Sequence, residues 1–137
     1  MSHFTRIRTQ LTEKQFIIQS LVDMGYQVVE AETGRTGVTV RGYGRGTTQA
    51  EFKIATPNPA YDIGFVKVAS GQSVEYEIVA DWYGIHSHIN QQQFIQQIGQ
   101  RYAYNLTIAK LVEQGFYLQQ EASETDGSMV LTMSRYA

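Results

Sequence analysis

The chain contains no cysteine among its 137 residues, and this absence removes several classes of protein at once. It excludes a disulfide framework, a thiolate nucleophile, and zinc or iron–sulfur sites with cysteine ligands. Apolar runs of membrane-spanning length are missing too, and the first residues lack the apolar core of a secretory signal. We therefore expect a soluble, cytoplasmic protein without membrane insertion.

Charge is also scarce in this sequence. Charged residues make up 18% of the chain, the net charge is -2, and the sequence pI is about 5.9. This balance argues against a generally basic nucleic-acid binder and leaves only a local basic patch for such a role. The length and the 42% apolar content fit a single domain, residues 1–137, with its own core.

The pattern that is present is an internal echo. Residues 21–26 read LVDMGY, and residues 111–116 read LVEQGF. Each segment closes a stretch with the apolar spacing of an amphipathic helix. We interpret the echo as an internal duplication of a β-α-β-β unit, with repeat one at about 3–43, a middle hairpin at about 49–70, and repeat two at about 74–136.

Two helices and several strands follow from local signals. The first helix is expected to open with Thr12 as its capping residue and to end near Gly25; the second should open at Asn90, end near Gly115, and bend near Gly99. Pairs of strands are expected at 27–32 with 37–43, 49–55 with 63–70, and 117–123 with 129–135, and a further strand at 74–82. The predicted fold class is α+β, an antiparallel sheet packed by two helices.

A row of carboxylates lies on one face of the expected strand at 74–82. Glu75, Glu77 and Asp81 occur at period-two spacing, and such a row can bind a cation or share a proton. The alternative is structural: Arg6 and Arg8 share a face of the first strand. If the duplication makes the two strands neighbours, arginine and glutamate form cross-strand pairs.

Two histidines after that strand allow a metal-site alternative. His86 and His88 can offer two nitrogens to one metal, and Asp81 or His3 is the nearest third ligand. This arrangement would suit a metal-dependent enzyme that uses Asp81, His86 and His88. Solvated surface histidines explain the same pattern, so we assign no metal ligand, cofactor or catalytic residue.

Residues 41–48, RGYGRGTT, form the most distinctive motif in composition. Glycines with arginine and tyrosine suit phosphate contact and base stacking, so binding of RNA or single-stranded nucleic acid through this Arg/Gly/Tyr loop is an alternative function. The run is not a phosphate-binding P-loop, because neither Lys-Ser/Thr nor a helix start follows the glycines. A flexible hairpin connection is the structural explanation.

The second helix carries Arg101, Tyr102 and Tyr104 close together. Arginine and tyrosine are favoured at interface hot spots, because they combine large contact area with specific hydrogen bonds. The tyrosines could equally pack under the sheet.

Several of these motifs together resemble a known family. They are MSHF at 1–4, VRGY at 40–43, YDIGF at 61–65, YEIVAD at 76–81, QRYAY at 100–104, QGF at 114–116 and DGS at 126–128. The set is similar to the hypothetical chloroplast reading frame 35 family of cyanobacterial and plastid genomes, a family without an established activity. The resemblance implies a protein partner, with an AAA-type ATPase as one candidate, and a location in the plastid stroma for a plastid-encoded member.

The function expected from these observations is a non-catalytic interaction module, an adaptor or accessory protein of a larger assembly. The motifs are rich in tyrosine, arginine and glycine, while no nucleophile, triad or phosphate loop is present. The expected partner-binding residues are Arg41, Tyr43, Tyr61, Asp62, Asp81, Trp82, Arg101, Tyr102 and Tyr104.

Overall fold

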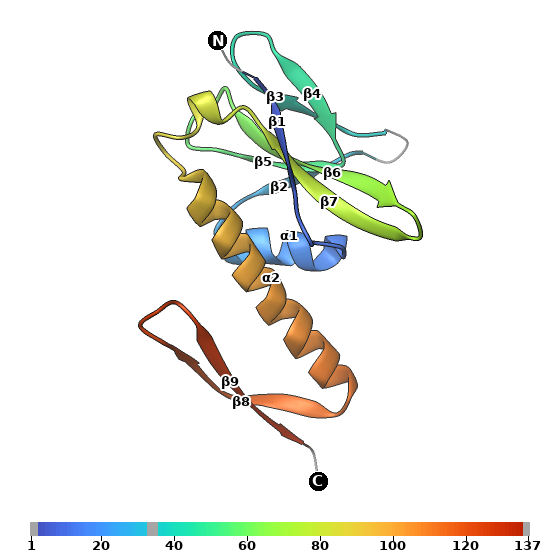
Figure 1. Ribbon diagram of the computed structural model, residues 1–137, viewed down its shortest axis with the longest axis vertical. Helices are drawn as coiled ribbons and strands as arrows, with labels where there is room; N and C mark the ends of the chain where they lie inside the picture. Colours follow the sequence, from blue (N-terminus) through green and yellow to red (C-terminus); the bar gives the residue numbers. More distant parts are fainter. Residues whose placement is uncertain (1–2, 33–35, 136–137) are drawn as a thin grey trace. The chain divides into compact units, whose positions relative to one another are not determined.

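A computed structural model describes residues 3–32 and 36–135 of the chain (Figure 1). Two helices and antiparallel sheets make up the fold, which confirms the α+β class. The chain divides into two compact units, Met1–Tyr102 and Ala103–Ala137. None of the helices in the described residues is long and apolar enough to cross a membrane.

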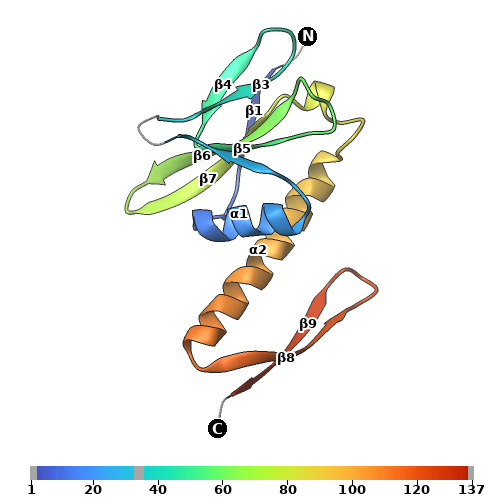
Figure 2. The ribbon, with the colours of Figure 1, turned by 180° about the vertical axis from the view of Figure 1, so that it is seen from behind.

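The first unit is built around a five-stranded antiparallel sheet. Its order is β1 (Thr5–Arg8), β7 (Ser73–Ala80), β6 (Asp62–Ser70), β5 (Phe52–Ala55) and β2 (Val28–Glu30). A separate two-stranded sheet pairs β3 (Val38–Arg41) with β4 (Thr47–Ala50). Helix α1 (Lys14–Asp23), the short 3-10 helix η1 (Trp82–Gly84) and the first part of helix α2 (Gln91–Glu113) complete the unit. Figure 2 shows the same elements from behind.

The expected arginine–glutamate pairs are present on this sheet. β1 lies antiparallel to β7, with Arg8 opposite Glu77. The Arg6 guanidinium lies 3.5 Å from the Glu77 carboxylate, and the Arg8 guanidinium lies 3.6 Å from the Glu75 carboxylate. Both arginines are exposed, so each pair contributes only about 0.2 to 1 kcal/mol. Glu75 and Glu77 therefore serve as cross-strand partners of the two arginines, whereas Asp81 lies beyond the end of β7.

The core of the first unit lies between the sheet and the helices. Phe52 and Phe65 stack at 4.9 Å between ring centroids, and Ile17, Leu21 and Phe94 bring buried side chains from α1 and α2. A smaller buried cluster of Val40, Ala50 and Val79 joins β3 and β4 to the main sheet. Gly64 allows this close approach, because an added Cβ there would lie 2.4 Å from Val40 Cγ2.

The helix ends agree with the sequence signals at three of four positions. Asn90 caps α2 by accepting a hydrogen bond from the Gln93 N–H at 3.0 Å, and Gly25 and Gly115 have positive φ after the two helices. The capping role expected for Thr12 is wrong, because α1 begins after Glu13 and has no side-chain cap of its own. Helix α2 is one continuous helix, and the bend expected near Gly99 stays a prediction.

Strand pairing differs from the expected hairpins in the first half of the chain. β2 pairs with β5, and β3 pairs with β4, whereas the sequence suggested that these two strands after α1 would pair with each other. β5 and β6 do form the expected middle pair. In the second unit β8 (Phe116–Ser123) pairs with β9 (Met129–Arg135), as expected. The strands that follow α1 therefore pair with other strands, whereas those that follow α2 pair with each other. The internal duplication stays a prediction.

Candidate interaction surface

Three motifs that are distant in the sequence meet at one end of the main sheet. Ile63 of β6 pairs with Ala80 of β7, so the neighbouring residues Asp62 and Asp81 lie at the same end of adjacent strands. Both aspartates receive hydrogen bonds from the chain at the end of β3. The Arg/Gly/Tyr loop, the start of β6 and η1 therefore form one site.

Asp62 anchors the first residue of this loop. Its carboxylate accepts hydrogen bonds from Arg41 Nε and Nη2, each at 2.9 Å, and from the Arg41 backbone N–H at 3.0 Å. Lys53 Nζ donates a further bond at 3.1 Å. Burial would raise the pKa of Asp62, but the hydrogen bonds from Arg41 and Lys53 hold it below its usual value. Asp62 is therefore a buried carboxylate that stays ionised.

Asp81 anchors the next part of the loop and the start of η1. One carboxylate oxygen accepts the backbone N–H of Tyr43 at 3.0 Å, and the other accepts that of Tyr83 at 3.3 Å. Gly42 packs directly against it, since an added Cβ would lie 3.0 Å from Asp81 Cβ. Asp81 is 2% exposed, so a single buried side chain binds the backbone of both the loop and η1.

Tyr61 fills the space under η1. Its ring covers Gly84 so closely that an added Cβ would lie 2.0 Å from the ring, which only glycine permits. Asn58, in the loop before Tyr61, donates a hydrogen bond to the Gly84 carbonyl at 2.9 Å. Burial, together with the nearby charge of Asp81, raises the pKa of the Tyr61 phenol. Tyr61 therefore supports the site from inside.

Above these buried groups lies an exposed aromatic cluster, which we call the tyrosine patch: Tyr43, Tyr83 and His86. Tyr43 is 56% exposed and Tyr83 is 57% exposed. Their rings meet edge to face with centroids 6.0 Å apart, and the Tyr83 ring lies 6.3 Å from that of His86. Sequence reasoning missed Tyr83 as a contact residue, although it directly follows Trp82 in the same motif.

The accessible charge on the loop that carries Tyr43 is positive. The Arg41 side chain is 48% exposed even while it binds Asp62, and Arg45 in the same loop is exposed. The two aspartates, by contrast, are buried and bound by backbone and side-chain donors. The loop therefore carries accessible guanidinium groups as well as the exposed ring of Tyr43.

The expected contact residues on α2 lie elsewhere. Arg101 binds Asp23 of α1, with 2.9 Å between Nε and the carboxylate. The buried Tyr102 hydroxyl accepts the backbone N–H groups of Thr12 at 3.2 Å and of Glu13 at 3.1 Å, so it holds the chain just before α1 begins. Tyr104 donates a hydrogen bond to Glu121 in the second unit.

Trp82, the remaining expected contact residue, is buried rather than open to a partner. Its ring packs 6.2 Å from that of Phe94, and its indole N–H has no hydrogen-bond partner in the described part of the chain. Six of the nine expected residues thus gather at the loop site, but only Arg41 and Tyr43 of these six present an accessible side chain.

The histidines do not assemble with Asp81 into a metal site. His86 Nδ1 lies 3.1 Å from the Trp82 carbonyl oxygen, and His88 Nδ1 lies 3.1 Å from the Ser87 hydroxyl. Within residues 3–32 and 36–135, no group of three or more histidine, aspartate or glutamate side chains could hold a metal ion. The geometry therefore gives no support to the metal-dependent alternative.

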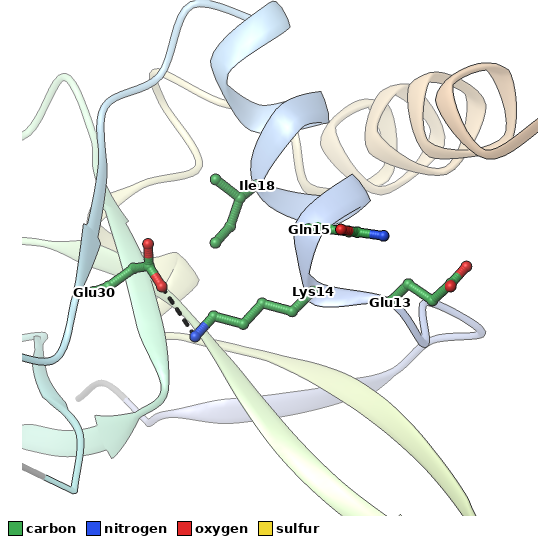
Figure 3. A pocket seen from close by; sticks show the side chains of 5 residues that line it. All are labelled: Glu13, Lys14, Gln15, Ile18 and Glu30. Carbon is green, nitrogen blue, oxygen red and sulfur yellow. Dashed lines mark ion pairs between the residues drawn. The ribbon is translucent and has the colours of Figure 1, made fainter. Parts of the chain in front are cut away.

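An open depression lies beside α1 at a separate position (Figure 3). Lys14 reaches across it to Glu30, with 2.9 Å between Nζ and the carboxylate, and also lies 3.2 Å from the Glu51 carboxylate. Glu13, Gln15 and Ile18 line the rest. Two acceptors already satisfy the lysine, so we interpret this cluster as a structural ion-pair network.

Comparison with known proteins gives a consistent family. A family model described as "Protein of unknown function (DUF1257)" matches residues 14–132. Proteins named "Uncharacterized protein ycf35" match almost the full length: 32% identity over 136 residues for Guillardia theta, and 26% over 136 residues for Cyanophora paradoxa. Each alignment covers 99% of this chain and 98% of the relative. The comparison with solved structures gave no significant match.

Proposed function

We propose that this chain, which belongs to the DUF1257 (ycf35) family, is a non-catalytic adaptor that binds an acidic segment of a protein partner through the tyrosine patch. The observation that carries the proposal is the contrast between the two sides of the site. The rings of Tyr43 and Tyr83 are exposed, whereas Asp81, which holds the backbone of both residues, is buried.

Fixed tyrosines favour binding for a thermodynamic reason. Association costs conformational entropy whenever loops and side chains become ordered at an interface. Here Asp81 already fixes the backbone of Tyr43 and Tyr83, and Gly42 and Gly84 pack tightly against neighbouring side chains. Much of the ordering is therefore complete before a partner arrives, and tyrosine offers large contact area with few rotatable bonds.

The charge of the loop supports an acidic partner. Arg41 and Arg45 are the accessible charged side chains of the loop, and both are cationic. Carboxylates suit guanidinium groups because both are planar and can form paired hydrogen bonds. An extended peptide with aspartate or glutamate beside an apolar residue would satisfy the rings and the arginines together.

Nucleic acid is the competing ligand, because arginine and exposed aromatic rings also bind phosphates and stacked bases. Two observations favour protein. The loop has just two accessible cationic side chains, Arg41 and Arg45, which do not make the long basic groove that follows a nucleic-acid backbone, and the chain as a whole is acidic, with a net charge of -2. A nucleic-acid ligand would show binding that falls steeply as salt rises, with a slope set by the number of phosphates contacted.

The partner should be sought where the family would act, in the cytoplasm or, for a plastid-encoded member, in the stroma. An AAA-type ATPase is one candidate. The decisive experiment compares recovery of one identified partner by the wild-type chain and by Tyr43→Ala and Tyr83→Ala, after nuclease treatment. Truncating a hot-spot tyrosine costs about 2 kcal/mol, so each variant should bind the partner about 30-fold more weakly.

Matched variants make this result specific. Val22→Ala removes an equally exposed apolar side chain from α1, outside the patch, and should leave affinity unchanged. Tyr43→Phe keeps the ring and should retain most of the binding. Equal affinity of Tyr43→Ala, Tyr83→Ala and Val22→Ala for the same partner would contradict the proposal. Recovery that disappears with nuclease would instead favour the nucleic-acid alternative.

A further inference from the structure

The second unit lacks a core of its own. Among its described residues, 103–135, Asn105 is the one buried residue, and no apolar side chain there is buried. Leu118 and Val130 on the hairpin are 36% and 49% exposed. A two-stranded hairpin is at best marginally stable in water without a further strand or an apolar cover. This hairpin therefore offers surface for an additional chain.

The two outer edges of the hairpin are not equivalent. In the described residues, β8 and β9 pair only with each other, so each has one open edge. β8 carries a register shift between Leu118 and Gln120 and a charge at Glu121, two features that hinder further strand pairing. β9 has no charged residue from Met129 to Ser134 and no proline. The edge suited to another strand is therefore that of β9.

The charges at the two ends of β9 are opposite. The turn before its first residue carries Glu124 and Asp126, while Arg135 lies at its last position. The pKa of Asp126 is lowered by hydrogen bonds from Ser128, so this carboxylate is ionised at neutral pH. An antiparallel copy of the same strand would place each arginine beside the acidic turn of the other copy, whereas a parallel copy would place like charges together.

We propose that two copies of this chain associate through β9, antiparallel about a twofold axis at Thr132, to form a continuous four-stranded sheet. In this register Thr132 faces Thr132 of the second copy, Leu131 faces Met133, and Arg135 faces Met129 next to the acidic turn. No like charges stand opposite each other. Met129, Leu131 and Met133 alternate onto one face of β9, so the two copies would join their apolar faces.

The test introduces a charged residue at the twofold axis. Thr132→Lys and Thr132→Glu each place two like charges directly opposite one another in the dimer, which disfavours pairing. Sedimentation equilibrium should show a dimer for the wild-type chain and self-association weakened about fivefold or more for either variant. An equal mixture of the two variants should associate more tightly than either alone, because lysine then faces glutamate.

A control and two outcomes complete the test. Thr107→Lys makes the same exchange at an exposed position of α2 and should leave the dimer unchanged. A monomeric wild-type chain across the accessible concentration range would overturn the proposal. Variants that dissociate but fail to recombine in the mixture would overturn the twofold register. Neither result depends on the tyrosine patch, whose variants should dimerise like the wild-type chain.

Discussion

Replacing Asp62 by alanine removes the acceptor of four hydrogen bonds at once. The donors are the backbone N–H, Nε and Nη2 of Arg41 and the ammonium of Lys53. Removing one partner of a buried charge pair costs about 3 to 5 kcal/mol, because the opposite charge stays behind without compensation. The Arg41 side chain is 48% exposed and can regain water, so we expect the lower end, about 3 kcal/mol.

Urea unfolding followed by circular dichroism measures this loss as a shift of the midpoint at unchanged slope. Asp62→Asn keeps the size and one acceptor oxygen, so it should recover part of the loss. Asp126→Ala is the matched control: it removes a carboxylate whose hydrogen-bond partner, Ser128, lies in the same exposed turn. A midpoint shift no larger for Asp62→Ala than for Asp126→Ala would refute the reasoning.

The pH dependence of folding stability gives a second test of the same contact. The pKa of Asp62 is lowered in the folded chain: burial would raise it, but hydrogen bonds from Arg41 and Lys53 outweigh burial. Its contribution to stability is therefore fully present above the unfolded pKa of about 4, and it is lost as pH falls through the folded pKa. The stability difference between wild type and Asp62→Ala should be constant near neutral pH and shrink below about pH 4. An unchanged difference down to the lowest pH at which the chain folds would contradict the assignment.

Two further substitutions test the supports of the site and of α1. Gly84→Ala should destabilise the chain by about 1 to 3 kcal/mol, because its Cβ would overlap the Tyr61 ring; combining it with Tyr61→Ala, measured by thermal unfolding, should give less than the sum of the two single losses. Tyr102→Phe removes the hydroxyl that accepts the Thr12 and Glu13 N–H groups and should cost about 1 kcal/mol in the same assay, whereas an unchanged midpoint would argue against this role.

Sequence reasoning succeeded where the signal was local or periodic. The alternation along β7 correctly placed Glu75 and Glu77 on one face, and their pairing with Arg6 and Arg8 followed from one assumption about neighbouring strands. Asn90 and the glycines after each helix were also read correctly, because a capping side chain or a positive φ acts within a few residues.

It failed where a distant group displaced the local one. Thr12 has the chemistry of a helix cap, but the Tyr102 hydroxyl, ninety positions along the chain, binds the N–H groups at the start of α1. Likewise, β3 would have paired with β2 by proximity in sequence, yet Val40 is buried with Val79 when β3 pairs with β4 instead. Such choices depend on burial in the assembled sheet, which no short segment encodes.

The sequence predicted the motifs of the candidate site, but not which of their side chains are exposed and which are buried. Arg41, Tyr43, Tyr61, Asp62 and Asp81 all appeared in the expected set, and the structure brings them together. Nothing in the sequence distinguishes an accessible tyrosine from a buried one in a motif of small and aromatic residues. Tyr83 and Gly84 are neighbours in η1, yet the Tyr83 ring is exposed, whereas the Tyr61 ring is buried and packs against Gly84.

Two buried aspartates at one end of a sheet call for an explanation beyond stability. Buried ion pairs contribute little net stability, since desolvation offsets most of the attraction, and apolar replacements of similar shape are often as stable. The carboxylates of Asp62 and Asp81 nevertheless accept hydrogen bonds from the backbone N–H groups of Arg41 and Tyr43. An apolar side chain could fill the same volume but could not fix those backbone groups. The arrangement therefore favours a role in holding the loop and its exposed ring in one position, which is what the proposed adaptor function would need.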